Sequence, residues 1–176
     1  MVAAPDSRPT VAELGALDAA AANAAALGGV AEHSPWVAEQ AHARGPFATL
    51  GELRAAFAAV IMTAPDERRL ALLCLHPELA GREAQSGALT ADSAGEQRAA
   101  RLDALTAGEL GRLRALNAAY RERFGFPFIA CVREHSVASL LAWAEARLAR
   151  TAEQEHDTAL AEVTKIVALR LAERVA

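Results

Sequence analysis

The sequence predicts an all-α protein: a single compact domain of about seven to nine helices, with no sheet. Of the 176 residues, 46 are alanine and only 5% are aromatic, although 53% are hydrophobic. Alanine and leucine are the strongest helix formers, so this composition favours closely packed helices over a sheet. A chain of this length can bury a core without disulfides or metal ions.

Capping residues and helix breakers place the elements in order. Residues 1–9, which contain two prolines, are expected to form a disordered lead, and the helical domain is expected to cover residues 10–176. Thr10 and Glu13 have the spacing of a capping box, and Thr49, Thr106 and Ser136 begin later helices. The expected helices cover about residues 11–27, 35–43, 50–63, 65–75, 106–124, 136–150 and 151–174. Another helix is expected to run through Leu105, with the N-cap candidates that precede it in the run from Thr90 to Ser93.

Charge and cysteine content restrict the partners and the compartment. The formal net charge is −4 and no basic stripe occurs, which argues against nucleic acid and anionic membranes as partners. No apolar run is long enough to span a membrane and no signal peptide is apparent, so a cytoplasmic protein is expected. Cys74 and Cys131 both have apolar neighbours and are interpreted as reduced core thiols.

The segment from Leu72 to Gly81 carries the first candidate for chemistry. An apolar run ends at His76, and Pro77 follows, which biases His76 away from helical dihedrals. A histidine held where a buried helix ends is a candidate for acid–base catalysis. The alternative is a structural histidine or a cation at a helix terminus. The other four histidines have polar or loop neighbours and are interpreted as surface residues.

Three further features could complete a site. Ser93 and Glu96 have the spacing of a capping box, and the same helix N-terminus could bind an anion, with Gln97 adding an amide. The run Phe124–Phe128 is either a buried corner or a pocket wall whose backbone groups face a ligand. Arg170 continues an apolar helical stripe, so its buried charge needs either a protein carboxylate or a bound anion.

Metal and cofactor chemistry find little support. Cys74 and His76, with Cys131 and His135, could be written as four ligands, but residues two apart on a helix point in nearly opposite directions. No glycine-rich phosphate loop, nucleophile elbow or zinc-protease motif occurs. No metal and no cofactor are therefore expected.

Five motifs taken together resemble one known family. The motifs are His76–Gly81, Ser93–Gln97, Asn117–Tyr120, Phe124–Phe128, and Glu162–Ile166 with Arg170 and Leu171. With these motifs in family order, the chain is similar from about residue 10 to 174 to the 2-oxo-4-hydroxy-4-carboxy-5-ureidoimidazoline (OHCU) decarboxylases of urate degradation. The family often has aspartate where Glu78 stands, a conservative difference.

The resemblance implies an all-helical, cofactor-free lyase that releases (S)-allantoin and carbon dioxide. The family's catalytic residues match His76, Glu96 and Arg170, with His76 handling the proton. Loss of carbon dioxide leaves an enolate-like carbanion, so the enzyme must stabilise negative charge and protonate one face. The substrate-binding positions carried over are Pro77, Ser93, Ala94, Gly95, Glu96, Gln97, Phe128, Ile129, Ala130, Cys131 and Val132.

Two alternatives remain open. The chain could be a helical module that binds an anionic or ureido ligand without turnover, or a related enzyme acting on a different ureido acid. Turnover of freshly generated substrate distinguishes an enzyme from the binding module, and a substrate panel distinguishes this activity from that of a related enzyme. The resemblance also favours a homodimer.

Overall fold

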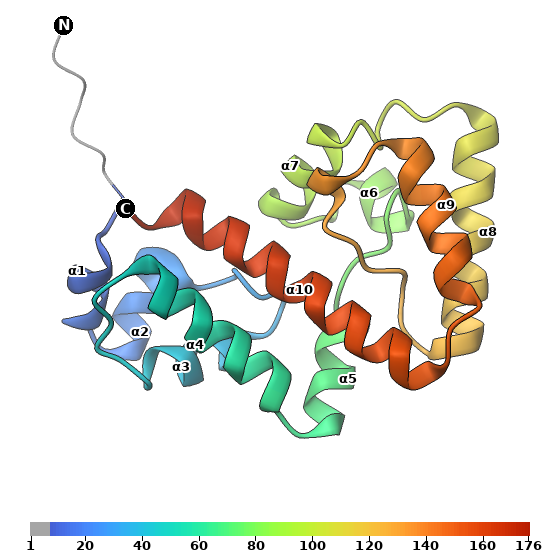
Figure 1. Ribbon diagram of the computed structural model, residues 1–176. Helices are drawn as coiled ribbons and strands as arrows, with labels where there is room; N and C mark the ends of the chain where they lie inside the picture. The colour runs from blue at the N-terminus through green and yellow to red at the C-terminus, as the bar shows by residue number, and fades with distance from the viewer. Residues whose placement is uncertain (1–7) are drawn as a thin grey trace, which may run out of the picture. The chain divides into compact units, whose positions relative to one another are not determined.

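The computed structural model describes residues 8–176, and all of its regular structure is helical (Figure 1). Within those residues there is no strand, which confirms the predicted all-α class. The disordered lead predicted for residues 1–9 falls mostly outside the described range. In chain order the elements are α1 (Val11–Gly15), α2 (Ala19–Ala22), η1 (Asn23–Leu27), α3 (Pro35–His42), α4 (Leu50–Thr63), α5 (Asp66–Cys74), α6 (Arg82–Ser86), α7 (Ala91–Ala99), α8 (Ala107–Phe124), η2 (Val132–Glu134), α9 (Val137–Leu148) and α10 (Ala152–Arg174).

The chain divides into two compact units. The first unit contains the residues up to Pro65 together with Thr164–Ala176, and the second contains Asp66–Val163. The long helix α10 therefore contributes its C-terminal turns to the first unit and its N-terminal turns to the second.

The first helical segment is shorter than predicted. The Thr10–Glu13 capping box forms as expected, and hydrogen bonds from the Thr10 backbone and side chain lower the pKa of Glu13. However, α1 ends at Gly15, and α2 starts after Asp18, whose carboxylate accepts the Ala21 N–H at 2.8 Å. The expectation of one helix over residues 11–27 is therefore wrong, because an aspartate side chain bonds the backbone and starts a new helix.

The core of the first unit lies around α3 and α4, which pack against each other. The buried face of α4 follows a helical period, since Leu53, Phe57, Val60 and Ile61 are at most 2% exposed. The start of α4 could be predicted from local sequence, because the Thr49 hydroxyl caps the helix by accepting the Glu52 N–H. The buried residues of this core include Val37, Ala38, Ala41, Leu53, Phe57, Val60, Ile61, Val167 and Leu171.

The second unit is built on α8 and α9, which lie side by side (Figure 1). Thr106 caps α8 as predicted, and its hydroxyl and backbone bonds to Glu109 lower the pKa of that carboxyl. The helix ends at Gly125, whose φ of +81° favours glycine. Tyr120 and Phe128 are fully buried, with their rings edge-on at a centroid distance of 5.1 Å. Within the aromatic run, Phe126 and Phe128 are thus buried and Phe124 is partly buried.

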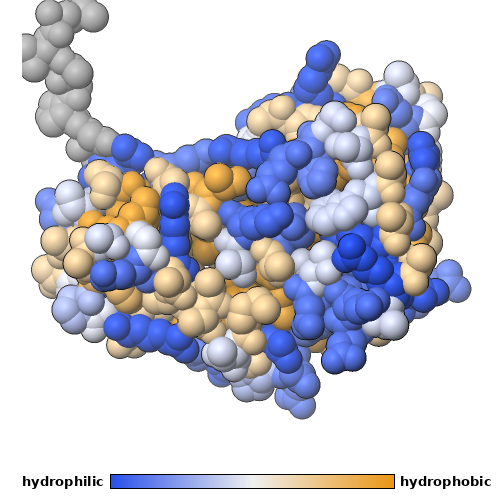
Figure 2. All heavy atoms as spheres, viewed as in Figure 1, coloured by the Kyte–Doolittle hydropathy of each residue, from blue (hydrophilic) through white to orange (hydrophobic). Residues whose placement is uncertain are grey.

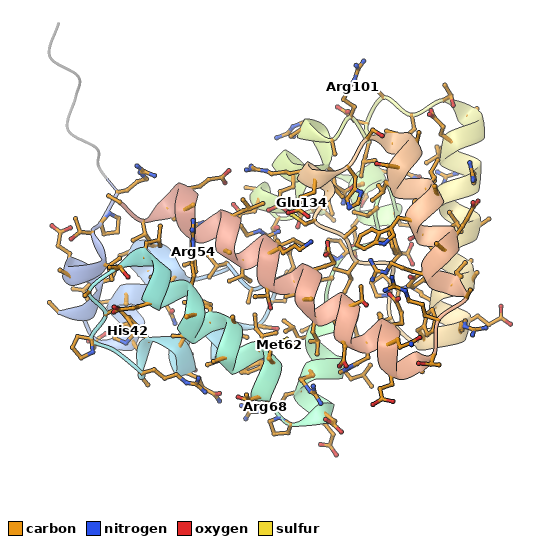
Figure 3. The ribbon with its side chains drawn as sticks, viewed as in Figure 1. His42, Arg54, Met62, Arg68, Arg101 and Glu134 are labelled. Carbon is orange, nitrogen blue, oxygen red and sulfur yellow. The ribbon has the colours of Figure 1, made fainter. Side chains whose placement is uncertain are left out.

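Several predictions about exposure need correction. Cys74 is exposed, whereas Cys131 is buried as expected. The cysteine at 74 lies at the end of α5, outside the pair of leucines that face the core. His33 is exposed as expected, but the other three supposed surface histidines are partly buried. His42 (Figure 3), for example, places its Nε2 3.0 Å from the Leu14 carbonyl oxygen.

The surface carries few large apolar side chains. On the face shown in Figure 2, hydrophilic side chains are interspersed with hydrophobic ones. Leu17, Met62, Leu70 and Leu75 are 38–45% exposed, and Met62 is labelled on α4 in Figure 3. None of the described helices is long and apolar enough to span a lipid bilayer.

Candidate active site

His76 lies directly after α5, at the helix end that the proline predicted. Its ring is 6% exposed, and Nδ1 lies 2.9 Å from the carbonyl oxygen of Leu72. A carbonyl oxygen can only accept a hydrogen bond, so Nδ1 carries the proton in this contact. In the neutral ring the lone pair is then on Nε2. The backbone of α5 therefore selects the tautomer in which Nε2 is the basic nitrogen.

The segment that follows His76 is held by two buried amide side chains. The Ala80 N–H donates to Gln97 Oε1 at 2.9 Å, and Asn117 Nδ2 donates to the Leu79 carbonyl oxygen at 3.1 Å. Ala80 has a φ of +50°, a conformation that costs a non-glycine residue about 1–3 kcal/mol. Such a conformation persists only where the surroundings enforce it. Gln97 and Asn117 thus tie the histidine segment to α7 and α8.

Gly81 closes this segment, and only glycine fits there. A Cβ at residue 81 would lie 2.6 Å from the Cβ of Glu78, which is closer than real Cβ contacts. Glu78 itself forms an ion pair with Arg121 of α8. The run from His76 to Gly81 is therefore compact and anchored at both ends.

Helix α7 begins earlier than the capping-box prediction placed it. Thr90 is the N-cap, and its hydroxyl accepts the Ser93 N–H at 3.3 Å. Ser93 is a donor inside the first turn, so the predicted Ser93–Glu96 capping box is wrong. Thr90 takes the role because it precedes the first helical residue and has the same capping chemistry. Ser93 and Gln97 are buried, and Glu96 is partly buried.

Helix α7 also ends earlier than the predicted Leu105. Arg101 (Figure 3) adopts a left-handed φ of +59°. The Leu102 N–H donates to the backbone carbonyl oxygen of Gln97, and the Arg101 N–H donates to the backbone carbonyl oxygen of Arg98, both at 2.9 Å. These bonds form a Schellman motif, which usually has glycine at the left-handed position. Because arginine stands there instead, the sequence carries no signal for this helix end.

The segment Phe128–Val132 is buried and presents backbone donors. Ile129, Ala130 and Val132 are 3–5% exposed, and their N–H groups have no hydrogen-bond partner in the part of the chain that the structure describes. Buried backbone N–H groups are nearly always paired in native proteins. A polar ligand can satisfy such donors, and the substrate-binding role expected for Phe128–Val132 stays a prediction. The following turn, η2, packs against α7.

Arg170 belongs to the first unit and is buried, as its helical stripe predicted. Its guanidinium is 2% exposed, and Nη1 lies 2.8 Å from Oε2 of Glu32, which is 1% exposed. Of the two partners left open by the sequence, the structure therefore supplies a protein carboxylate. Glu32 was missed because it precedes Arg170 by 138 residues, in an irregular segment without a pattern.

Three more buried charged residues were missed in the second unit, namely Arg147, Glu155 and Glu162. Glu162 Oε2 accepts the Cys131 N–H at 2.8 Å, and Arg147 Nη1 donates to the Ile129 oxygen at 2.8 Å. Arg147 could have been found by helical spacing, since buried Leu140, buried Ala144 and Arg147 are separated by four and then three residues. The stripe argument applied to Arg170 thus holds for Arg147 as well.

One group of side chains could in principle hold a metal ion. Glu134 (Figure 3), His135 and Glu162 each place a ligand atom within 4.8 Å of the others. Glu162 already accepts the Cys131 N–H, however, and Glu134 is exposed. This group is distinct from the cysteine and histidine set considered from the sequence.

The fold and these residues define a class: an all-helical enzyme with a tautomer-selected histidine and backbone donors suited to a polar ligand. The chain belongs to the OHCU decarboxylase family, whose profile matches residues 16–172. It is 42% identical to the 2-oxo-4-hydroxy-4-carboxy-5-ureidoimidazoline decarboxylase of Haloferax volcanii, over 85% of this chain and 86% of that one.

Solved structures agree in fold. A structure of (S)-allantoin synthase superposes with a TM-score of 0.76 and 34% sequence identity. That alignment covers 96% of this chain but only 54% of the other, so the chain spans about half of that protein. An OHCU decarboxylase crystallised in the presence of (S)-allantoin superposes with a TM-score of 0.62 at 23% identity, over 82% of this chain and 94% of that one. The resemblance inferred from five motifs is therefore confirmed.

Proposed function

We propose that this protein is a carboxy-lyase that converts 2-oxo-4-hydroxy-4-carboxy-5-ureidoimidazoline to (S)-allantoin and carbon dioxide in urate degradation, without a cofactor. Family membership and the activity named for its relatives support the substrate. The observation in the structure that carries the proposal is His76, whose Nδ1 is bound to a backbone oxygen so that Nε2 serves as the acid–base atom.

The proposed chemistry needs one proton at one position. The bond between the ring carbon and the carboxylate breaks, carbon dioxide leaves, and the electron pair remains on the ring as an enolate-like carbanion. A proton then adds to one face of the ring carbon that carries the ureido group, which gives a single enantiomer. His76 handles that proton, and Pro77 beside it contacts the substrate. Positioned acid–base catalysis contributes about 10²–10⁴-fold in rate.

The remaining residues bind and orient the substrate. Glu96 orients the imidazole or accepts the ureido N–H groups, and Ser93–Gln97 forms one side of the binding surface. Arg170 pairs with the negative charge of the substrate, while Glu32 holds the guanidinium in place. The N–H groups of Ile129, Ala130 and Val132 donate to substrate oxygens, which supplies partners for donors that are otherwise buried and unpaired.

A turnover assay with a substrate panel tests the proposal. The purified protein is mixed with freshly generated substrate and with related ureido acids, and allantoin is followed by chiral chromatography. We expect (S)-allantoin well above the spontaneous racemic background, with the ureidoimidazoline preferred. Saturable binding without turnover would indicate the helical binding module instead, and preference for another ureido acid would indicate a related enzyme.

Assembly and compartment are part of the same proposal. We expect a homodimer in the cytoplasm, acting on a small molecule with no nucleic acid or membrane partner. The net charge of −4 supports the absence of a polyanionic partner. The family resemblance supports the dimer.

A further inference from the structure

Arg147 of α9 is fully buried and contacts four different groups in the second unit. Its side chain is 0% exposed and forms an ion pair with Glu155 of α10, which is also 0% exposed. Its Nη1 donates to the Ile129 oxygen at 2.8 Å. The guanidinium carbon lies 4.8 Å from the Phe128 ring centre and 4.4 Å from that of Trp143. Each of the three guanidinium nitrogens therefore donates a hydrogen bond, and two aromatic rings lie close to the group.

These contacts fix the segment Phe128–Val132 from its protein side. Arg147 holds the Ile129 oxygen, and the ring of Phe128 lies against its guanidinium group. Two residues further on, Glu162 accepts the Cys131 N–H at 2.8 Å. A carbonyl group and an N–H group on either side of Ala130 are thus bound to buried charges. These two anchors therefore set the orientation of the Ile129–Ala130 and Ala130–Cys131 peptide groups.

Stability alone does not explain a buried ion pair of this kind. Removing two charges from water is costly, and well-packed apolar residues of similar volume are often as stabilising or more so. A pair whose arginine also bonds a loop carbonyl group has a geometric effect that apolar residues cannot reproduce. Arginine is suited to it because its planar guanidinium group can bind a carboxylate, donate elsewhere and stack on rings.

We propose that Arg147 is a positioning residue for the decarboxylation: it holds the backbone N–H groups of Ile129, Ala130 and Val132 in the orientation that binds the substrate. This inference rests on the proposed function, because it assigns those N–H groups to the substrate. Arg147 does not touch the reacting atoms. It acts through the Ile129 oxygen and the Phe128 ring.

The test replaces the whole buried pair, so that no charge is left unpaired. The double variant Arg147→Met with Glu155→Leu keeps apolar volume and should melt close to the wild-type temperature. The loss of the bond to the Ile129 oxygen should raise KM about tenfold, the effect of one hydrogen bond to a charged group. The excess of (S)-allantoin should fall as well, because a loosely held substrate accepts protons on both faces.

A second variant covers the case in which the double variant does not fold. Arg147→Lys retains the charge beside Glu155, but an ammonium group lacks the planar fork that reaches both Glu155 and the Ile129 oxygen while lying against the Phe128 ring. It should show the same rise in KM and the same loss of enantiomeric excess.

The matched control is another arginine–glutamate pair of the second unit. Arg112 of α8 and Glu145 of α9 form an exposed ion pair that does not involve residues 128–132. Arg112→Met with Glu145→Leu should leave KM and enantiomeric excess unchanged. If the wild-type protein turns over the substrate and the folded Arg147 variants keep its KM and enantiomeric excess, this inference alone is overturned. Absence of turnover by the wild-type protein would overturn the proposed function and this inference together.

Discussion

At the residue scale, His76 links backbone structure to side-chain chemistry. The carbonyl oxygen of Leu72 accepts the Nδ1 proton, so the last turn of α5 determines which imidazole nitrogen is basic. The neighbouring proline ensures that the helix ends there. The sequence predicted the helix end and the candidate residue, while the tautomer required knowledge of the carbonyl group that the ring faces.

Substitution of this histidine should abolish the proposed catalysis. His76→Ala, with its helical circular dichroism retained, should lose about 10²–10⁴-fold in the rate of (S)-allantoin formation, because no group delivers the proton. His42→Ala is the matched control, since His42 also bonds a backbone oxygen but belongs to no proposed site. Equal turnover by wild type and the His76 variant would remove His76 from the mechanism.

Arg170 and Glu32 are a second case at the residue scale. Both are almost completely buried, so removing one partner leaves a buried unpaired charge. Glu32→Ala should lower the free energy of unfolding by about 3–5 kcal/mol, measured by denaturant titration.

Replacement of both partners separates structure from catalysis. Glu32→Leu with Arg170→Met should recover most of that stability, since apolar pairs can replace buried ion pairs. It should nevertheless remain inactive, because the substrate's negative charge has no partner. A stable double variant with normal turnover would reduce Arg170 to a structural role.

At the scale of elements, the boundaries of α7 show what local sequence encodes. The cap at Thr90 was among the predicted candidates, and a preference for Ser93 misplaced the start by three residues. The end at Ala99 had no signal, because arginine occupies the left-handed position of the Schellman motif. Elements bounded by conventional caps, such as α4 and α8, were predicted closely.

The unusual arginine gives an element-scale prediction. Arg101→Gly should raise the free energy of unfolding by about 0.5–1 kcal/mol, because glycine adopts a φ of +59° without steric cost. Arg98→Gly, three residues earlier inside the helix, should instead lower it by roughly 1 kcal/mol. Thermal or denaturant melting of both variants measures the difference. A destabilised Arg101→Gly would show that the arginine side chain itself contributes to stability.

At the scale of the whole molecule, the proposed homodimer is directly measurable. Sedimentation equilibrium should give twice the chain mass of 18.5 kDa at micromolar concentration. Leu70 of α5 and Leu75, the residue after that helix, are more than 40% exposed, so both can be substituted without disturbing the core. Leu70→Glu with Leu75→Glu should weaken the dimer if this surface contributes to it. A monomeric wild-type protein would contradict the expectation of assembly.

Much of the fold and of the candidate site could be predicted because the signals are local. A hydrogen bond between a capping residue and the third helical residue is encoded within four positions, as at Thr10 and Thr106. Helical periodicity likewise placed Arg170 on a buried face. Five short motifs in order were enough to indicate the family that the comparisons then confirmed.

The sequence by itself determined the helical class, most helix starts, the buried histidine at a helix end and the family. Only the tertiary structure decided which charges meet: Glu32 with Arg170, and Arg147 with both Glu155 and the Ile129 oxygen. The physical reason is burial. A charge inside a protein must be paired, but a helical pattern says only that a side chain faces inward. Which residue it meets there depends on packing between segments far apart in the chain.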